Sequence, residues 1–178
     1  MSLTTPEDPD GRPVTVWTLE MGASTHLIPA RRPRGDAVLR DESPPSAEQS
    51  RFFYRSVGGP WSWVDRAPWT DEQWQAWVSR PAFRQLSCWI DGEPAGYAEL
   101  DHQAGTVELA YFGLLPAYIG QGLGGWLLTA ALRAAWSMPG ARGVWVHTCS
   151  LDGPAAMANY LARGFVVRRT DIEYRTRG

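Results

Sequence analysis

Lysine is absent from this sequence of 178 residues, because all 17 of its basic side chains are arginines. A lysine Schiff base, a lysine general base and a phosphate site built on a lysine ammonium group are therefore excluded. The chain has 19 aspartates and glutamates, which gives a net charge of -2 at pH 7. This charge gives no indication of a nucleic-acid partner, which would be recognised by a basic face.

Long apolar runs and a secretion signal are also missing from the sequence. No stretch approaches the roughly 20 apolar residues of a membrane-spanning helix. Residues 1–13 are polar and acidic, and they lack the basic and then apolar regions of a signal peptide. We expect residues 1–13 to be flexible and the protein to be cytoplasmic, with no membrane partner.

The two cysteines, Cys88 and Cys149, do not have the spacing of a metal or redox motif. We expect two buried free thiols, with a disulfide between them as the alternative. No metal site is expected.

The composition is that of a globular domain. Hydrophobic residues make up 44% of the chain, and this length suffices for one domain with a sizeable core. We therefore expect a single domain over residues 1–178. Within it, the Pro-, Arg- and Gly-rich stretch 22–45 predicts a long loop insert.

Periodicity, capping residues and turn dipeptides predict the remaining elements. In chain order these are a strand at 14–21, helices at 46–57 and 70–80, strands at 83–90, 94–101 and 106–115, a helix at 122–138, a strand at 143–149, a helix at 153–163 and a strand at 165–174. The order predicts an α/β (α+β) fold with a mixed, mostly antiparallel sheet and one parallel crossover.

The sharpest local feature is the segment Ile119-Gly120-Gln121-Gly122-Leu123-Gly124-Gly125, which follows a predicted strand and opens a predicted helix. Glycines allow backbone amides to approach an anion closely, and the helix N-terminus adds the positive end of its dipole. The segment therefore predicts a phosphate or pyrophosphate site.

Two other phosphate ligands fit the segment less well. Gly120, Gly122 and Gly125 match the spacing of dinucleotide-binding folds, but such folds need an acidic residue about 20 positions later. Residues 109–151 contain no Asp or Glu. A nucleotide-binding P-loop is excluded because no Lys-Ser or Lys-Thr follows the glycines. The pyrophosphate of coenzyme A remains.

Two motifs resemble those of the GNAT superfamily of acetyl-CoA-dependent N-acetyltransferases. The run Leu114-x-Pro116-x-x-Ile119-Gly120-x-Gly122-x-Gly124 is similar to the family motif V-x-P-x-x-[RQ]-G-x-G-x-[GA], with Ile119 in place of Arg or Gln. The run from Ala155 through Tyr160 to Gly164-Phe165 is similar to the family ending A-x-x-x-x-Y-x-x-x-G-F, with Gly153 where an Asn is frequent.

The resemblance implies the family fold, with a sheet of about six to seven strands, helices on both faces and a splay between the strands at 106–115 and 143–149. It implies that the strand ending near Leu114 carries a bulge, with which Gly113 is compatible. It also implies that acetyl-CoA is the co-substrate, bound by a set of residues along this strand and turn: Phe112, Gly113, Leu114, Leu115, Ile119, Gly120, Gln121, Gly122, Leu123, Gly124 and Gly125.

The resemblance also implies two catalytic side chains. Glu108 takes the position of a family general base, and Tyr160 takes the position of the tyrosine that protonates the CoA thiolate. Glu99 is an alternative base, and His102 and His147 are weaker ones. Cys149 is the one residue that could support a covalent acyl-enzyme.

In this family the region between the first two helices usually lines the acceptor pocket. Here that region offers aromatic faces and one carboxylate, which suit an ammonium group: Tyr54, Trp61, Trp63 and Asp65. We expect a small-molecule or peptide amine acceptor and a monomer or homodimer. A non-catalytic acyl-CoA-binding module and a nucleotide-dependent oxidoreductase are the competing functions.

Overall fold

The structure, a computed structural model, describes residues 11–33 and 35–175. A seven-stranded sheet runs through it in the order β2-β3-β4-β5-β6-β1-β7. Its strands are β1 (Arg12–Met21), β2 (Val38–Glu42), β3 (Phe83–Ile90), β4 (Glu93–Gln103), β5 (Thr106–Leu114), β6 (Gly143–Cys149) and β7 (Val166–Arg175). Its helices are α1 (Ala47–Gly58), α2 (Asp71–Val78), α3 (Leu123–Ser137) and α4 (Ala156–Ala162).

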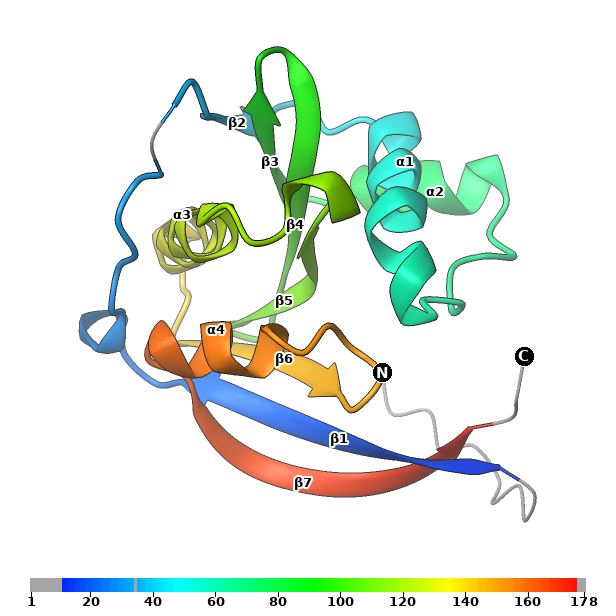
Figure 1. The fold of residues 1–178 in the computed structure, drawn as a ribbon, viewed down its shortest axis with the longest axis vertical. Helices are drawn as coiled ribbons and strands as arrows, with labels where there is room; N and C mark the ends of the chain where they lie inside the picture. Colours follow the sequence, from blue (N-terminus) through cyan, green and yellow to red (C-terminus); the bar gives the residue numbers. More distant parts are fainter. Residues whose placement is uncertain (1–10, 34, 176–178) are drawn as a thin grey trace.

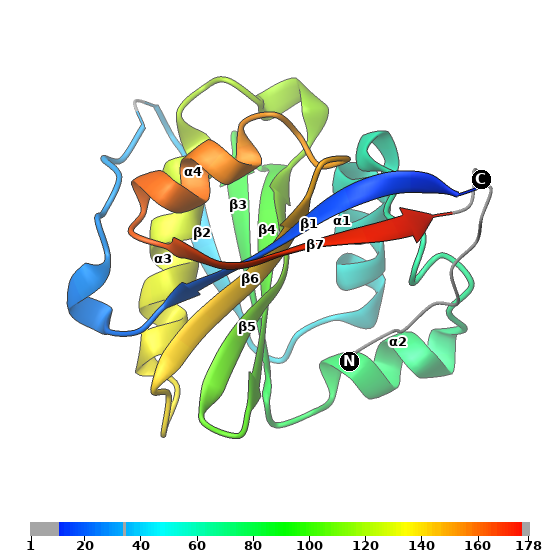
Figure 2. The ribbon, with the colours of Figure 1, turned by 90° about the horizontal axis from the view of Figure 1, so that it is seen from below.

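The helices cover the sheet on both faces, with α1 and α2 on one side and α3 and α4 on the other (Figures 1 and 2). The main core lies between the sheet and the pair α3 and α4, and includes Leu19, Leu100, Leu109, Leu128 and Leu132. A smaller cluster under α1 joins Phe53 and Val57 to Tyr97 of β4. The predicted mixed α/β fold is confirmed.

Every neighbouring pair of strands is antiparallel except β5 and β6. These two run parallel and pair at three positions, of which Glu108 opposite Trp145 is the last. Beyond Glu108 the strands carry no further paired residues, so β5 and β6 diverge. This is the predicted splay.

β5 carries a bulge, but not at the expected place. Leu109 lies opposite Leu100, and Tyr111 lies opposite Glu99, so Ala110 is the extra residue. Gly113, which was expected to accommodate the bulge, has a different role. Val57 of α1 packs against it where a Cβ would lie.

Capping explains where the first two helices begin. The Ser46 hydroxyl accepts a hydrogen bond from the Gln49 amide at 3.2 Å. Thr70 and Gln73 form a reciprocal capping box at the start of α2. These caps agree with the predicted helix starts at 46 and 70, although α2 ends at Val78 rather than near residue 80.

Three other boundaries differ from the prediction. The stretch 22–45, expected to be a loop, contains a short 3-10 turn (Ser24–His26) and the edge strand β2, which pairs with β3. β1 begins at Arg12 rather than at 14, so the expected flexibility does not apply to Arg12 and Pro13; residues 1–10 lie outside the described part. Helix α4 begins at Ala156 instead of 153, after a turn that contains Pro154. Among the described helices, none has the length and apolar character needed to cross a membrane.

Candidate active site

Glu108 lies where β5 and β6 separate. It is opposite Trp145 in the parallel ladder and opposite Asp101 in the antiparallel ladder with β4. Its neighbours Val107 and Leu109 are buried in the core with α3. Because side chains alternate along a strand, Glu108 faces the other side of the sheet, which α1 and α2 share.

The surroundings of Glu108 favour its protonated form. Burial raises the pKa of its carboxyl above the ordinary value and the charge of Asp101 adds to the rise, whereas Arg66 and Arg80 oppose it. Asp101 is paired with Arg80, whose Nη1 lies 3.1 Å from its Oδ1. Within residues 11–33 and 35–175, Glu108 has no such cation. A carboxylate with a raised pKa is a stronger base, which suits proton abstraction near neutral pH.

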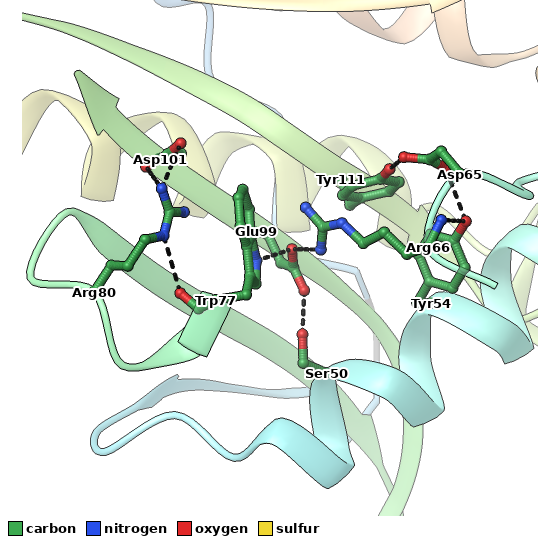
Figure 3. Close-up of polar contacts among 9 residues, drawn as sticks. All are labelled: Ser50, Tyr54, Asp65, Arg66, Trp77, Arg80, Glu99, Asp101 and Tyr111. Carbon is green, nitrogen blue, oxygen red and sulfur yellow. Dashed lines mark hydrogen bonds and ion pairs between the residues drawn. The ribbon is translucent and has the colours of Figure 1, made fainter. Parts of the chain in front are cut away.

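The bulge at Ala110 brings Tyr111 to the same face as Glu108. Without it, residues three positions apart in a strand would face opposite sides. The Tyr111 hydroxyl donates to one oxygen of Asp65, and the Tyr54 hydroxyl donates to the other at 2.8 Å (Figure 3). Burial raises the pKa of both phenols. Both therefore remain protonated donors that hold Asp65 beside the sheet.

Arg66 forms an ion pair with Glu99 beneath this cluster. Arg66 Nη1 lies 2.7 Å from Glu99 Oε2, and the two residues are 4% and 0% exposed. Glu99 also accepts hydrogen bonds from the Trp77 indole, at 3.0 Å, and from the Ser50 hydroxyl (Figure 3). Three donors engage the carboxylate, which favours a structural role over the expected role of alternative base.

Aromatic rings enclose the Arg66 guanidinium. Its central carbon lies 4.0 Å from the ring centroid of Trp77, 4.1 Å from that of Tyr111 and 4.7 Å from that of Trp69. Such contacts stabilise a desolvated cation. This part of the tryptophan-rich region therefore packs around an internal charge.

The predicted acceptor tryptophans lie on the loop after α1. The Trp63 ring packs against Tyr54 and Tyr111, with centroids 5.7 and 4.9 Å apart. Trp61 reaches the loop between β6 and α4, where its ring lies 3.2 Å from the position that a Cβ on Gly153 would occupy. The loop after α1 thus extends from the β5 side of the splay to the β6 side. Gly153 stands where the family motif frequently has an Asn, and because it has no side chain it leaves space for Trp61.

Tyr160 lies on the opposite face of the sheet from Glu108. Its ring is 5% exposed and packs beside Phe112 of β5 and Phe165, with centroids 6.1 and 5.9 Å away. Phe112 belongs to the part of β5 that no longer pairs with β6. The Tyr160 hydroxyl donates no hydrogen bond to any residue in the described ranges, and burial raises its pKa, with Asp152 adding to the rise. The phenol therefore remains protonated.

The glycine turn leaves its backbone open at the start of α3. Gly120 and Gly122 have φ angles of +83° and +78°, and a Cβ on either would meet nothing within 4 Å. Gly122 is the N-cap of α3, and no side chain caps the first turn. The Gln121 side chain donates to the Ala117 carbonyl at 2.9 Å and braces the turn. Exposed amides at a helix N-terminus favour an anion.

The remaining predicted donor-site residues lie either at the end of β5 or on the glycine turn. Phe112, Gly113 and Leu114 form the end of β5 that pairs with β4 but not with β6, and Leu115 follows them. Leu123 is 1% exposed with its side chain in the core, so only its backbone is available to a ligand. The Ile119 side chain is 47% exposed.

Three other candidate residues, His102, His147 and Cys149, are less suited to the expected catalytic roles. His102 follows Asp101 in β4 and so lies on the other face of the sheet from Glu108. His147 lies beside Trp145, where partial desolvation and the charge of Arg169 lower its pKa, which favours the neutral imidazole. Cys149 is a free, partly buried thiol whose pKa is raised by burial and by Asp152. A raised pKa reduces the thiolate needed for an acyl-enzyme.

Sequence reasoning missed two members of this site, Arg66 and Tyr111. In a regular strand, Tyr111 would face the opposite side of the sheet from Glu108, and nothing in the sequence places the bulge at Ala110. Arg66 follows Asp65 directly, in a loop where no periodicity shows which side chain turns inward. In the described residues no cluster of side chains is able to hold a metal ion.

Comparison with known proteins decides the family. The model described as "Acetyltransferase (GNAT) family" matches residues 47–165, which include α1 to α4 and the glycine turn. The chain belongs to the GNAT family of acetyltransferases. Acyl transfer is the general activity of that family. No curated protein matches the chain significantly.

Solved structures share the GNAT fold. A GCN5-related N-acetyltransferase from Kribbella flavida has a TM-score of 0.66 and 22% identity, over 89% of this chain and 56% of that chain. One from Sphaerobacter thermophilus has a TM-score of 0.69 and 19% identity, over 91% and 51%. A GNAT-family acetyltransferase from Streptococcus pneumoniae has a TM-score of 0.59 and 22% identity, over 75% and 86%. This chain spans about half the length of each of the first two neighbours.

Proposed function

We propose that this protein transfers an acetyl group from acetyl-CoA to a primary amine of a small molecule or peptide, by direct attack in a ternary complex. The observation that carries the proposal is the placement of Glu108 at the divergence of β5 and β6, with Tyr160 on the opposite face. A thioester lying in the splay would have a base on one side and a proton donor on the other. The family match supports acyl transfer in general.

The donor is expected along β5 and the glycine turn. The unpaired backbone of Phe112–Leu115 is available to the pantetheine arm, since β6 does not use it. The pyrophosphate is expected at the turn formed by residues 119–125, where Gly120 and Gly122 keep the amides open. Backbone amides bind phosphate without a contribution from the side chain of Ile119.

The reaction requires that one proton is removed from the amine and that one proton is supplied to the departing CoA thiolate. The amine lone pair attacks the thioester carbonyl carbon, and Glu108 takes the amine proton, directly or through water. As the C–N bond forms and the C–S bond breaks, the Tyr160 hydroxyl gives its proton to the departing CoA thiolate. The products are the acetylated amine and CoA-SH.

The acceptor is expected on the α1 side of the sheet, with Glu108. Tyr54, Trp61, Trp63 and Asp65 lie around that end of the splay, and the exposed carboxylate of Asp65 is held by two phenols. Aromatic faces and a carboxylate favour a cationic amine. Since the Arg66 guanidinium already occupies the deeper aromatic cluster, the acceptor amine would lie above it.

Release of CoA thiol from acetyl-CoA in the presence of an amine panel tests the proposal. We expect turnover with at least one amine, a fall of about 10²- to 10⁴-fold in kcat for Glu108→Gln, and a fall in kcat larger than the change in acetyl-CoA affinity for Tyr160→Phe. Tight acetyl-CoA binding without turnover on any amine would favour a non-catalytic acyl-CoA-binding module. Equal activity of Tyr160→Phe would remove the role of Tyr160 as the acid.

A further inference from the structure

Arg163 lies against the first turn of α3. It is the C-cap of α4, and its Nη1 is 2.5 Å from the position that a Cβ on Gly125 would occupy. Asn159, one turn earlier in α4, has its side-chain oxygen 3.5 Å from the same position. Glycine at 125 therefore allows the guanidinium to lie directly on the backbone of α3.

The segment after β1 packs against α3 and α4 at the same place, and we call the place where the three meet the α3–α4 corner. The Ile28 amide donates to the Arg163 carbonyl at 3.0 Å, and the Ala30 amide donates to the Thr129 hydroxyl of α3 at 2.9 Å. The Ala30 methyl group lies 3.0 Å from the Cβ position at Gly125. The ribbon shows this segment passing the end of α4 and then running beside α3 (Figure 1). Arg163 thus lies where the end of α4, the first turn of α3 and the segment after β1 meet.

The α3–α4 corner brings together two positive charges, and no carboxylate of the described residues pairs with them. The N-terminus of α3 carries the positive end of its dipole, and Arg163 adds a formal charge beside it. Among residues 11–33 and 35–175 no carboxylate forms an ion pair with Arg163. Its Nε is buried and has no hydrogen-bond partner there. An unsatisfied buried donor beside open helix amides is typical of a site that binds an anion.

We propose that Arg163 is a phosphate ligand of the acyl-CoA donor, a contact that extends the glycine turn onto α4. The inference rests on the proposed function, because it takes acyl-CoA as the donor. The guanidinium can bind a phosphate group through two parallel N–H donors. The donor carries two candidate groups, the pyrophosphate and the 3′-phosphate of the adenosine, and CoA and dephospho-CoA distinguish them.

Calorimetric titration at fixed ionic strength, with CoA and with dephospho-CoA, tests the inference. Arg163→Gln is expected to weaken CoA binding by about 10- to 100-fold, as for a lost charged hydrogen bond. Arg133→Gln is the matched control, because it removes an exposed arginine farther along α3 that has no ion pair in the described residues. A loss confined to CoA assigns Arg163 to the 3′-phosphate, and an equal loss with dephospho-CoA assigns it to the pyrophosphate; both support the inference.

A second variant tests the same contact without removing the charge. Gly125→Ala places a methyl group where Nη1 now lies, so it displaces the guanidinium and is expected to weaken CoA binding as well. Melting temperatures without ligand show whether each variant is folded. Unchanged CoA affinity in either folded variant overturns the inference while the proposed function stands. If the wild-type protein binds neither CoA nor dephospho-CoA, the proposed function itself fails.

Discussion

At the scale of single residues, the position of Glu108 in the sheet determines the electrostatic environment of its carboxyl group. It has a raised pKa because it is half-buried next to Asp101, while the nearby arginines are held by Glu99 and Asp101. A carboxylate at a solvated position would titrate lower and accept a proton less readily.

The pH dependence of kcat/KM tests this role. Because the base acts in its deprotonated form, activity should rise with pH through the pKa of Glu108, which lies above the ordinary value near 4.3 for a glutamate. The rate profile of the wild-type enzyme is compared with that of Glu108→Gln. We expect the variant to lose this rising limb; an identical limb in the variant would assign the titration to another group, with His147 as the first to test.

The buried ion pair between Arg66 and Glu99 is expected to be important for stability. Replacing Glu99 by Gln leaves the enclosed guanidinium without its countercharge, which costs about 3–5 kcal/mol of unfolding free energy in buried pairs. Urea denaturation measures the loss. Glu173→Gln, which breaks an exposed pair with Arg175 in β7, is the control and should cost less than about 1 kcal/mol. Equal losses in the two variants would contradict the structural role of the pair.

Part of the candidate site follows from residue types and motifs. The glycine turn was predicted as an anion site from its local sequence, whereas the roles proposed for Glu108 and Tyr160 come from the family resemblance. The environment of Glu108 was not predictable, because the charges of Arg66 and Arg80, which lower its pKa, come from segments outside the strands next to it. The role of Gly153 also emerged only from contact with Trp61, distant in sequence.

At the scale of secondary-structure elements, two strands shape the site. β5 pairs with β6 only up to Glu108, and its bulge at Ala110 brings Tyr111 onto the face that α1 covers. The first feature leaves the β6 side of the β5 backbone free, where we propose that the donor binds, and the second anchors the loop that carries Asp65.

The junction between α4 and β7 holds the segment after β1 against α4. Gly164 has a φ of +102°, and a Cβ there would collide with the carbonyl oxygen of His26. Gly164→Ala should therefore lower the unfolding free energy by about 2 kcal/mol or more. Gly22→Ala is the control, because Gly22 has neither a positive φ nor a neighbour within 4 Å. A loss no greater than that of the control would mean that this junction adapts without strain.

Sequence patterns located most elements to within a few residues, because their caps and turns are local. Ser46, the Thr70–Gln73 box and the turn Asp91-Gly92 each determine an end of an element from neighbouring positions. β2 was missed since an edge strand of five residues in a Pro-, Arg- and Gly-rich stretch has little periodicity of its own. It forms by pairing with β3, a contact that local sequence does not encode.

At the scale of the whole molecule, the seven strands and four helices place three sequence-distant regions around one splay. The loop after α1 supplies the proposed acceptor side, the end of β5 supplies the proposed donor backbone, and α4 supplies Tyr160. The order of elements predicted this fold class, because only one connection, from β5 through α3 to β6, joins parallel neighbours.

The central claim is that the splay and the glycine turn bind an acyl-CoA donor. A thermal-shift titration with acetyl-CoA, CoA, NADH and ATP side by side tests it most directly. At a hundredfold excess over Kd, a ligand of the native state raises the melting temperature of a domain of this size by about 5 to 10 °C. We predict this shift with acetyl-CoA and CoA and none with NADH or ATP. A shift with NADH, or with none of the four, would contradict the assignment of the glycine turn and with it the proposed acetyl transfer.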